Sequence, residues 1–155
     1  MMQFDKTLGK HITSLSYLLS KQLNKLLSER NSGITSDQFR LLSNLWRKDG
    51  ITQQKLAIYI GRDRASVTRM ITILEDIGIV TRIANNTDKR VNLIYLTKKG
   101  RELEPIAWQC VQESLSLVTK GFNTEEIALF EQLLIRASDN LKPVVCSTIK
   151  SKLSK

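Results

Sequence analysis

The run of residues 52–90 constrains the fold most, because its apolar spacing changes from a helical to a strand-like period. Two short helical patterns come first, at 52–60 and 63–77. Two β-rich segments follow, at 79–83 and 91–96, and the polar stretch between them contains no apolar residue from 85 to 90. Residues of the types that cap or end helices mark the helix boundaries, namely Thr52, Gly61, Asp63 and Gly78. This order predicts a helix-turn-helix followed by a β-hairpin.

The second of these helices is apolar on one side and polar on the other. Its inner side is expected to carry Val67, Met70, Ile71, Leu74 and Ile77. Its outer side combines arginines with small and hydroxylated residues, which suit a helix that enters the major groove of DNA: Arg64, Ala65, Ser66, Thr68, Arg69 and Thr72. Arginine can pair with guanine O6 and N7, and hydroxyls can contact bases or phosphates. We therefore expect base contacts here, with Arg62 in the preceding turn and Gln53 placed to bond the DNA backbone. Any one of these residues alone could equally be an ordinary surface residue.

The hairpin loop is expected to contact DNA through Asn86, Asp88, Lys89 and Arg90. An arginine at a hairpin tip fits the narrow minor groove, where the negative potential is greatest. Asp88 could pin the long side chain of Arg90 and so reduce the entropy lost on insertion. The alternative is a charged turn that only protects the edge of a sheet. The complete pattern predicts a winged helix-turn-helix over residues 35–97.

Amphipathic helices flank this module on both sides. Apolar residues spaced by three and four trace a helix over about 4–27, and similar stripes run through about 97–120 and from 123 to Pro143, which is expected to end or kink the helix. The fold class is therefore mainly α with a small β-hairpin wing. We divide the chain into an N-terminal dimerisation helix (1–34), the winged helix-turn-helix (35–97), C-terminal dimerisation helices (98–142) and a basic tail (143–155).

The formal charge of +9 is distributed unevenly along the chain. Basic residues outnumber acidic ones 8 to 4 in residues 1–50 and 9 to 4 in 51–100, whereas 101–155 holds seven of each. A localised basic surface favours a polyanionic partner. On charge alone, a solvated basic face that aids solubility explains the excess equally well.

Other function classes lack their signatures. The chain has one His, no Gly-rich phosphate loop and no metal-ligand spacing around Cys110 or Cys146, so we expect neither an enzyme nor a cofactor. Capping explains the paired carboxylates of Glu125 and Glu126 at a helix start. With no signal-like N-terminus and no membrane-length apolar run, a cytoplasmic location with reduced thiols is expected.

The motifs resemble those of the MarR family of winged-helix regulators over residues 35–101: TSDQF at 35–39, LA at 56–57, GRDR at 61–64, VTR at 67–69, LEDIG at 74–78, VTR at 80–82, DKR at 88–90 and LTKKGR at 96–101. The Asp-x-Arg wing followed by Leu-Thr-x-x-Gly is the more specific part. One departure is Asn85-Asn86-Thr87, where many members have a proline-bearing loop.

The resemblance implies a homodimer that binds a pseudo-palindromic promoter site, as a repressor released by a small ligand. It implies base contacts from Arg64, Ser66, Thr68 and Arg69, and a wing pair at Asp88 and Arg90. An effector crevice between the DNA-binding module and the dimer helices could be lined by His11, Tyr17, Trp46 and Trp108, although such aromatic residues more often belong to a core. Two alternatives stay open: an interaction module for protein or RNA, and a redox sensor that uses Cys110 or Cys146.

Overall fold

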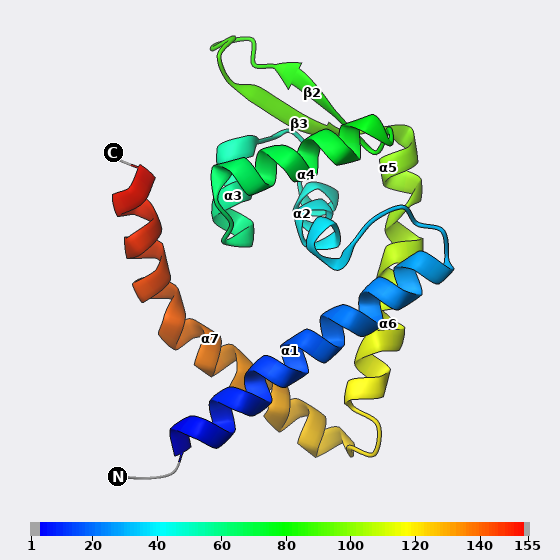
Figure 1. Ribbon diagram of the computed structural model, residues 1–155, viewed down its shortest axis with the longest axis vertical. Coiled ribbons are helices and arrows are strands. Elements are labelled where there is room, and N and C mark those ends of the chain that lie inside the picture. The colour runs from blue at the N-terminus through cyan, green and yellow to red at the C-terminus, as the bar shows by residue number, and fades with distance from the viewer. Residues whose placement is uncertain (1–3, 154–155) are drawn as a thin grey trace. The chain divides into compact units, whose positions relative to one another are not determined.

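The computed structural model describes the backbone of residues 4–153 and the side chains of residues 7–142 (Figure 1). The chain divides into two compact units, residues 1–115 and 116–155. The helices and strands, in chain order, are α1 (Phe4–Glu29), α2 (Ser36–Arg47), β1 (Ile51–Thr52), α3 (Gln53–Ile60), α4 (Arg64–Asp76), β2 (Val80–Ala84), β3 (Asn92–Leu96), α5 (Lys98–Glu102), α6 (Glu104–Val118) and α7 (Thr124–Leu153). The predicted fold class, mainly helical with a small β wing, is confirmed.

Local capping explains why the helices of the first unit begin where they do. Thr35 and Gln38 form a reciprocal capping box at the start of α2. The Thr52 hydroxyl accepts from the backbone N–H of Lys55 at the start of α3, and Gly61 ends that helix in the left-handed region at φ 64°. The predicted helix boundaries at Thr52, Gly61 and Asp63 are therefore confirmed.

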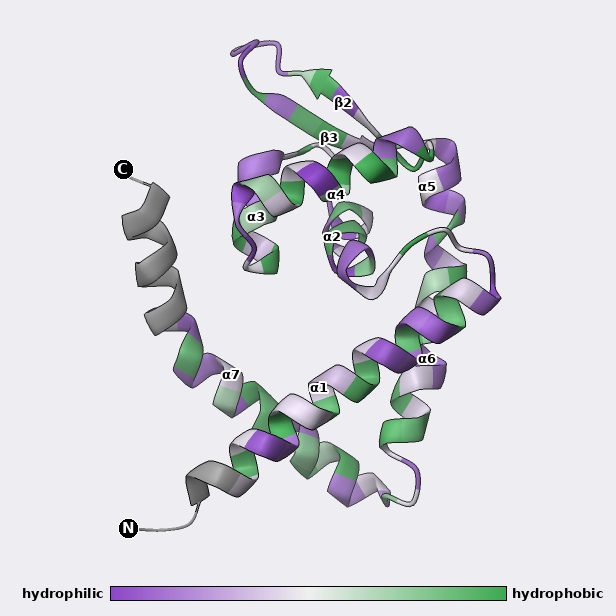
Figure 2. Ribbon diagram, viewed as in Figure 1, coloured by the Kyte–Doolittle hydropathy of each residue, from purple (hydrophilic) through white to green (hydrophobic). Residues whose placement is uncertain are grey.

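The wing is a three-stranded antiparallel sheet with the order β1-β3-β2. The hairpin of β2 and β3 was predicted, and in its register Arg82 lies opposite Ile94. Strand β1, which pairs Ile51 with Ile94, was not predicted, because two residues are too short to show a period. Figure 2 shows the loop between β2 and β3 as predominantly hydrophilic, which agrees with a solvated wing tip.

The core of the first unit lies beneath the wing and between the helices. Helix α2 buries Leu41, Leu42 and Leu45, and α4 buries Val67, Ile71 and Leu74, as expected for its inner face. Met70 and Ile77 are half-buried against this core. Helix α1 adds only Leu23 and Leu27 to the fully covered set, near its C-terminal end. The earlier half of the α1 stripe is exposed: Leu8, Ile12, Leu15 and Leu18.

The predicted continuous helix over about 97–120 is instead two helices, α5 and α6, with Leu103 between them. Pro105 explains the interruption, since it has no N–H to donate to the carbonyl of Arg101. Of the two expectations for Pro143, the end of the helix is wrong, because α7 continues past this residue to Leu153. A proline in a long helix removes one backbone hydrogen bond without necessarily ending the helix.

Helix α7 makes up most of the second unit. It begins with the predicted cap, in which Asn123 and Glu126 exchange side-chain to backbone hydrogen bonds of 2.9 Å each. Phe122 packs edge-on against Phe130, with ring centroids 5.9 Å apart. Large apolar side chains of α7 remain exposed: Ile127, Leu129, Leu133, Leu134, Ile135 and Leu141. Within residues 4–153, no helix is long and apolar enough to cross a membrane.

Candidate nucleic-acid interface

Helix α4 presents the predicted base-reading residues on a solvent-facing side. Arg64, Thr68, Arg69 and Thr72 are exposed, and Ser66 is half-buried. The opposite side of the helix packs on the core, so the helix backbone that carries these side chains is held in place. A helix anchored on one face and polar on the other can lie in a major groove without rearranging the module.

Asp63 secures the first turn of α4. Its carboxylate accepts from the Ser66 hydroxyl at 2.6 Å and from the Ser66 backbone N–H at 2.9 Å. These two hydrogen bonds, the side-chain one foremost, hold the pKa of Asp63 below its ordinary value. Ser66 therefore supports the helix start, and its hydroxyl hydrogen is directed at the Asp63 carboxylate.

The two threonines of α4 are also hydrogen-bonded within the protein. The Thr68 hydroxyl donates to the carbonyl of Arg64 at 2.8 Å, and the Thr72 hydroxyl donates to that of Thr68 at 3.0 Å. A hydroxyl has one hydrogen to donate and two lone pairs that accept. In this arrangement the threonines can still accept from a base amino group, but they have no hydrogen left for a phosphate oxygen.

Gln53 and Arg62 form contacts within the module. The Gln53 side-chain amide donates to the Thr68 hydroxyl, which ties the start of α3 to the outer face of α4. The Arg62 guanidinium lies 3.0 Å from both carboxylate oxygens of Asp37, the latter on the first turn of α2. Arg62 is thus exposed but already paired with a carboxylate, unlike the arginines on α4.

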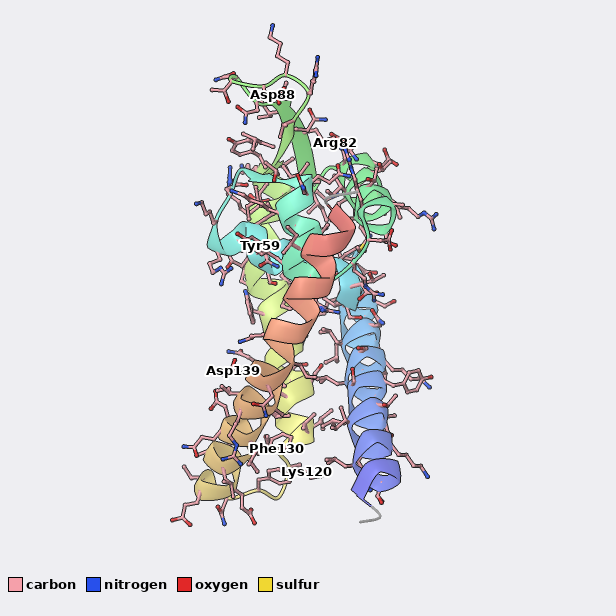
Figure 3. All side chains as sticks on the ribbon, turned by 90° about the vertical axis from the view of Figure 1, so that its left-hand side faces the viewer. Tyr59, Arg82, Asp88, Lys120, Phe130 and Asp139 are labelled. Atoms are coloured by element: carbon pink, nitrogen blue, oxygen red, sulfur yellow. The ribbon has the colours of Figure 1, made fainter. Side chains whose placement is uncertain are left out.

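The wing loop is shaped by its own side chains. The Asn85 amide oxygen accepts from the backbone N–H and the hydroxyl of Thr87, at 3.0 and 2.9 Å. Asp88 accepts from the backbone N–H of Arg90 at 3.0 Å. Among the described side chains, no ion pair joins Asp88 to the Arg90 guanidinium, so the expected pinning of that side chain is not seen; Asp88 instead shapes the turn. Asn86, Asp88, Lys89 and Arg90 are all exposed, and Figure 3 shows Asp88 at the wing tip.

The sequence did not predict Arg82 as a residue of the site, although the structure gives it several contacts. Arg82, on β2 and labelled in Figure 3, bonds Glu75 and Thr72 of α4, as the hydrogen-bond geometry shows. The only signal in the sequence was a Glu and an Arg seven positions apart across the Gly78 turn. That spacing has no fixed geometry until the turn and the strand are built.

The predicted effector residues fall into two groups. Trp46 and Trp108 both contact Phe39, with ring centroids 5.8 and 5.2 Å from it. The two tryptophans line a groove of about 390 Å³ together with Ser43, Asn44, Arg47 and Glu104. His11 and Tyr17 are exposed on α1 and are not among the lining residues of that groove.

The cysteines give little support for redox chemistry. Cys110 is fully buried on α6, and its sulfur accepts from the Arg30 guanidinium at 3.0 Å. Arg30 also donates to Glu113 at 2.5 Å, and these bonds, the one to Glu113 foremost, raise the pKa of Arg30. Cys146 lies outside the described side chains. No cluster of three metal-binding side chains occurs in the described part of the chain.

Known proteins share this arrangement. The profile of the MarR family matches residues 34–91. The multiple antibiotic resistance protein MarR of Escherichia coli (strain K12) is 32% identical over 128 residues, which cover 82% of this chain and 88% of that protein.

Two solved structures extend the likeness to the fold. A MarR transcriptional regulator from Methanosarcina mazei Go1 superposes with a TM-score of 0.79 at 30% identity, covering 89% of this chain and 99% of the other. A putative MarR family regulator from Listeria monocytogenes, solved in complex with a 26mer DNA, has a TM-score of 0.79 at 26% identity, covering 91% and 93% of the two chains. The motifs, the fold and these likenesses agree, and the chain belongs to the MarR family of DNA-binding transcriptional regulators rather than to a family of enzymes.

Proposed function

We propose that the protein acts as a homodimeric repressor on a pseudo-palindromic promoter site and is released from it by a small ligand. The observation that carries the proposal is the outer face of α4, where exposed arginines and hydroxyls are held by a capped helix next to a basic wing. Such a protein would act in the cytoplasm, where its DNA is.

Base reading is assigned to α4. Arg64 and Arg69 would pair with guanine O6 and N7, since both are exposed and neither has a carboxylate partner among the described ion pairs. Ser66, Thr68 and Thr72 would accept from adenine N6 or cytosine N4, because their hydrogens are donated within the protein. These hydroxyls would thereby discriminate bases and would not serve as phosphate donors.

Backbone anchoring is assigned to the wing. Lys89 and Arg90 would lie along or within the minor groove, and Asn86 would bond the sugar-phosphate backbone. Asp88 would act indirectly, by holding the turn that presents Arg90. Gln53 and Arg62 would support the interface from inside the module, through Thr68 and Asp37 respectively.

Dimerisation is assigned to the flanking helices, residues 1–34 and 98–142. Helix α1 exposes Leu8, Ile12 and Leu18 by 54–58%, and α7 exposes Leu134 and Leu141 by 48 and 63%. Exposing apolar stripes of this length to water is unfavourable, and such stripes are typical of a subunit interface. A second copy would cover them and set the spacing of the two recognition helices.

The groove between α2 and α6 is assigned as the binding site of the ligand that releases the protein from DNA. Its walls include Trp46 and Trp108, which offer apolar surface, and Arg47 and Glu104, which offer charge. α2 packs on the helix-turn-helix core, so a ligand that changes its position relative to α6 would also move α4.

Selection from random duplex DNA, followed by footprinting at two salt concentrations, tests the DNA assignment. We expect protection of two half-sites with centres about one helical turn apart, and binding that weakens steeply with salt. A single protected half-site would contradict the dimer, and binding to RNA but not to duplex DNA would contradict the regulator itself.

Sedimentation of an Ile12→Asp variant tests the dimer interface. This substitution places a charge on the apolar stripe of α1 and should shift the protein towards monomer. Thr13→Asp, which introduces the same charge on the side of the helix that faces away from Leu8, Leu15 and Leu18, should leave the dimer intact. Equal behaviour of both variants would remove α1 from the interface.

A thermal-shift screen of small aromatic and amphipathic compounds tests the groove, with Trp108→Ala as the matched variant. A compound that stabilises the wild type and weakens DNA binding should lose both effects in the variant. Retention of both effects would place the ligand site elsewhere.

A further inference from the structure

We propose that Arg82 is a positioning residue that locks the wing to the recognition helix, and that it does not contact phosphate. The inference rests on the proposed DNA-binding function and adds to it a device that sets the angle between wing and helix. Arg82 lies on β2, nearer the base of the wing than Asp88, and faces α4 (Figure 3).

The Glu75 carboxylate binds both the backbone and the side chain of Arg82. One carboxylate oxygen accepts from the Arg82 backbone N–H at 3.1 Å, and the other forms an ion pair with the guanidinium. β2 is an edge strand of the sheet, so this backbone N–H has no partner strand on that side. Glu75 therefore holds both the side chain and the free edge of the wing against the last turns of α4.

The second guanidinium nitrogen reaches further along the same helix. Arg82 Nη2 donates to the Thr72 hydroxyl at 2.9 Å and lies 3.5 Å from the carbonyl oxygen of Thr68. The Thr72 hydroxyl in turn donates to the backbone carbonyl of Thr68, and the hydroxyl of Thr68 accepts from Gln53. Two sets of hydrogen bonds thus meet at Thr68, one from β2 and one from the start of α3.

These contacts leave Arg82 poorly suited to bind phosphate. Its side chain is 22% exposed and Glu75 is 34% exposed, so the pair is partly shielded from water. The guanidinium donates to a carboxylate and to a hydroxyl at the same time. This arrangement needs the planar, multiple donors of arginine and does not suit the single ammonium group of lysine. The pair also carries no net charge, so it would release no counterion from DNA.

Three variants separate positioning from direct contact: Arg82→Met, Glu75→Gln and the double substitution. Their affinity for a duplex selected by the wild-type protein is measured at several salt concentrations, with Lys48→Met, an exposed position at the end of α2, as a control for the loss of one cation. Each single variant should bind roughly ten- to hundredfold more weakly, the range expected for losing a charge-assisted hydrogen bond. The double variant should be no weaker than either single variant, and the salt slopes of Arg82→Met and of the double variant should stay that of the wild type.

A phosphate contact would give the opposite result. Glu75→Gln would then bind as tightly as the wild type or more tightly, because it removes a negative charge, and Arg82→Met would flatten the salt slope. Arg82→Lys distinguishes the two roles in a variant that keeps its charge: lysine should fail to restore binding if Arg82 positions the wing, and should restore it if Arg82 contacts phosphate. Failure of the wild-type protein to bind any duplex would refute the proposed function itself, a different outcome from either of these.

Discussion

Replacing Arg90 with methionine removes the cation at the wing tip while keeping most of the length of the side chain. The structure suits this test, because Asp88 bonds the backbone of Arg90 and not its guanidinium. The loop geometry should therefore survive the substitution. What is lost is a free charge that the proposed interface places at the minor groove.

The expected size of the effect follows from counterion release. Each phosphate neutralised contributes about 0.9 to the slope of log affinity against log salt, so a dimer that loses Arg90 from both copies should lose about 1.8. Between about 50 and 200 mM salt, that difference makes the wild-type affinity fall about twelvefold more than the variant affinity.

Arg62 provides the comparison within the same module. It is exposed like Arg90, but its guanidinium lies 3.0 Å from the Asp37 carboxylate, which also lies 3.8 Å from Arg40, so Arg62 is already held by an anion within the protein. Arg62→Met should therefore leave the slope near that of the wild type. Asp37→Asn should steepen it, because the substitution frees Arg62 for a phosphate.

Fluorescence anisotropy with a labelled duplex, titrated at five or more salt concentrations, measures all four proteins. If Arg62→Met and Arg90→Met flattened the salt slope equally, the reasoning would be refuted. That result would show that pairing with a carboxylate in the protein does not affect an arginine's contribution to the slope. An unchanged slope in Arg90→Met would remove the wing tip from the phosphate contacts.

Three further predictions concern the fold that holds the interface. Leu74→Ala, at a fully buried position on α4, should lower the free energy of unfolding in urea by about 2–5 kcal/mol, and a smaller loss would mean that the core refills the space. Gly100→Ala would place a Cβ 2.2 Å from the carbonyl oxygen of Ile79, so it should destabilise the protein by about 1–3 kcal/mol or more. A neutral result in thermal unfolding would show that α5 can move away from Ile79. The pKa of Asp63 is depressed below its ordinary value of 3.8 by Ser66, so the ionised cap stabilises the fold above that value and this contribution is lost as pH falls through the folded pKa. Asp63→Asn, which keeps a capping side chain, should thus lose less stability than the wild type between about pH 5 and pH 3 in urea unfolding, and identical losses would contradict the assignment.

The sequence predicted those parts of the fold that depend on neighbouring residues. The caps at Thr52, Asp63 and Asn123 form as expected, because each joins groups only three positions apart. The hairpin follows from two β-rich runs around a polar loop, and the inner face of α4 follows from its helical period. In contrast, the sequence did not predict β1 or the interruption at Leu103, since two residues show no period and the apolar stripe continues on both sides of Pro105.

For the candidate site, residue type and order identified the exposed cations but not their partners. Arg62, Arg64, Arg82 and Arg90 are all arginines in one basic module, yet Arg62 is paired with Asp37 and Arg82 with Glu75. These pairings join residues 25 and 7 positions apart, across turns whose geometry exists only in the folded chain. Local chemistry thus determined which residues could meet DNA. The tertiary structure decided which of them remain free to do so, because the charge left for a partner depends on the carboxylates that folding brings alongside.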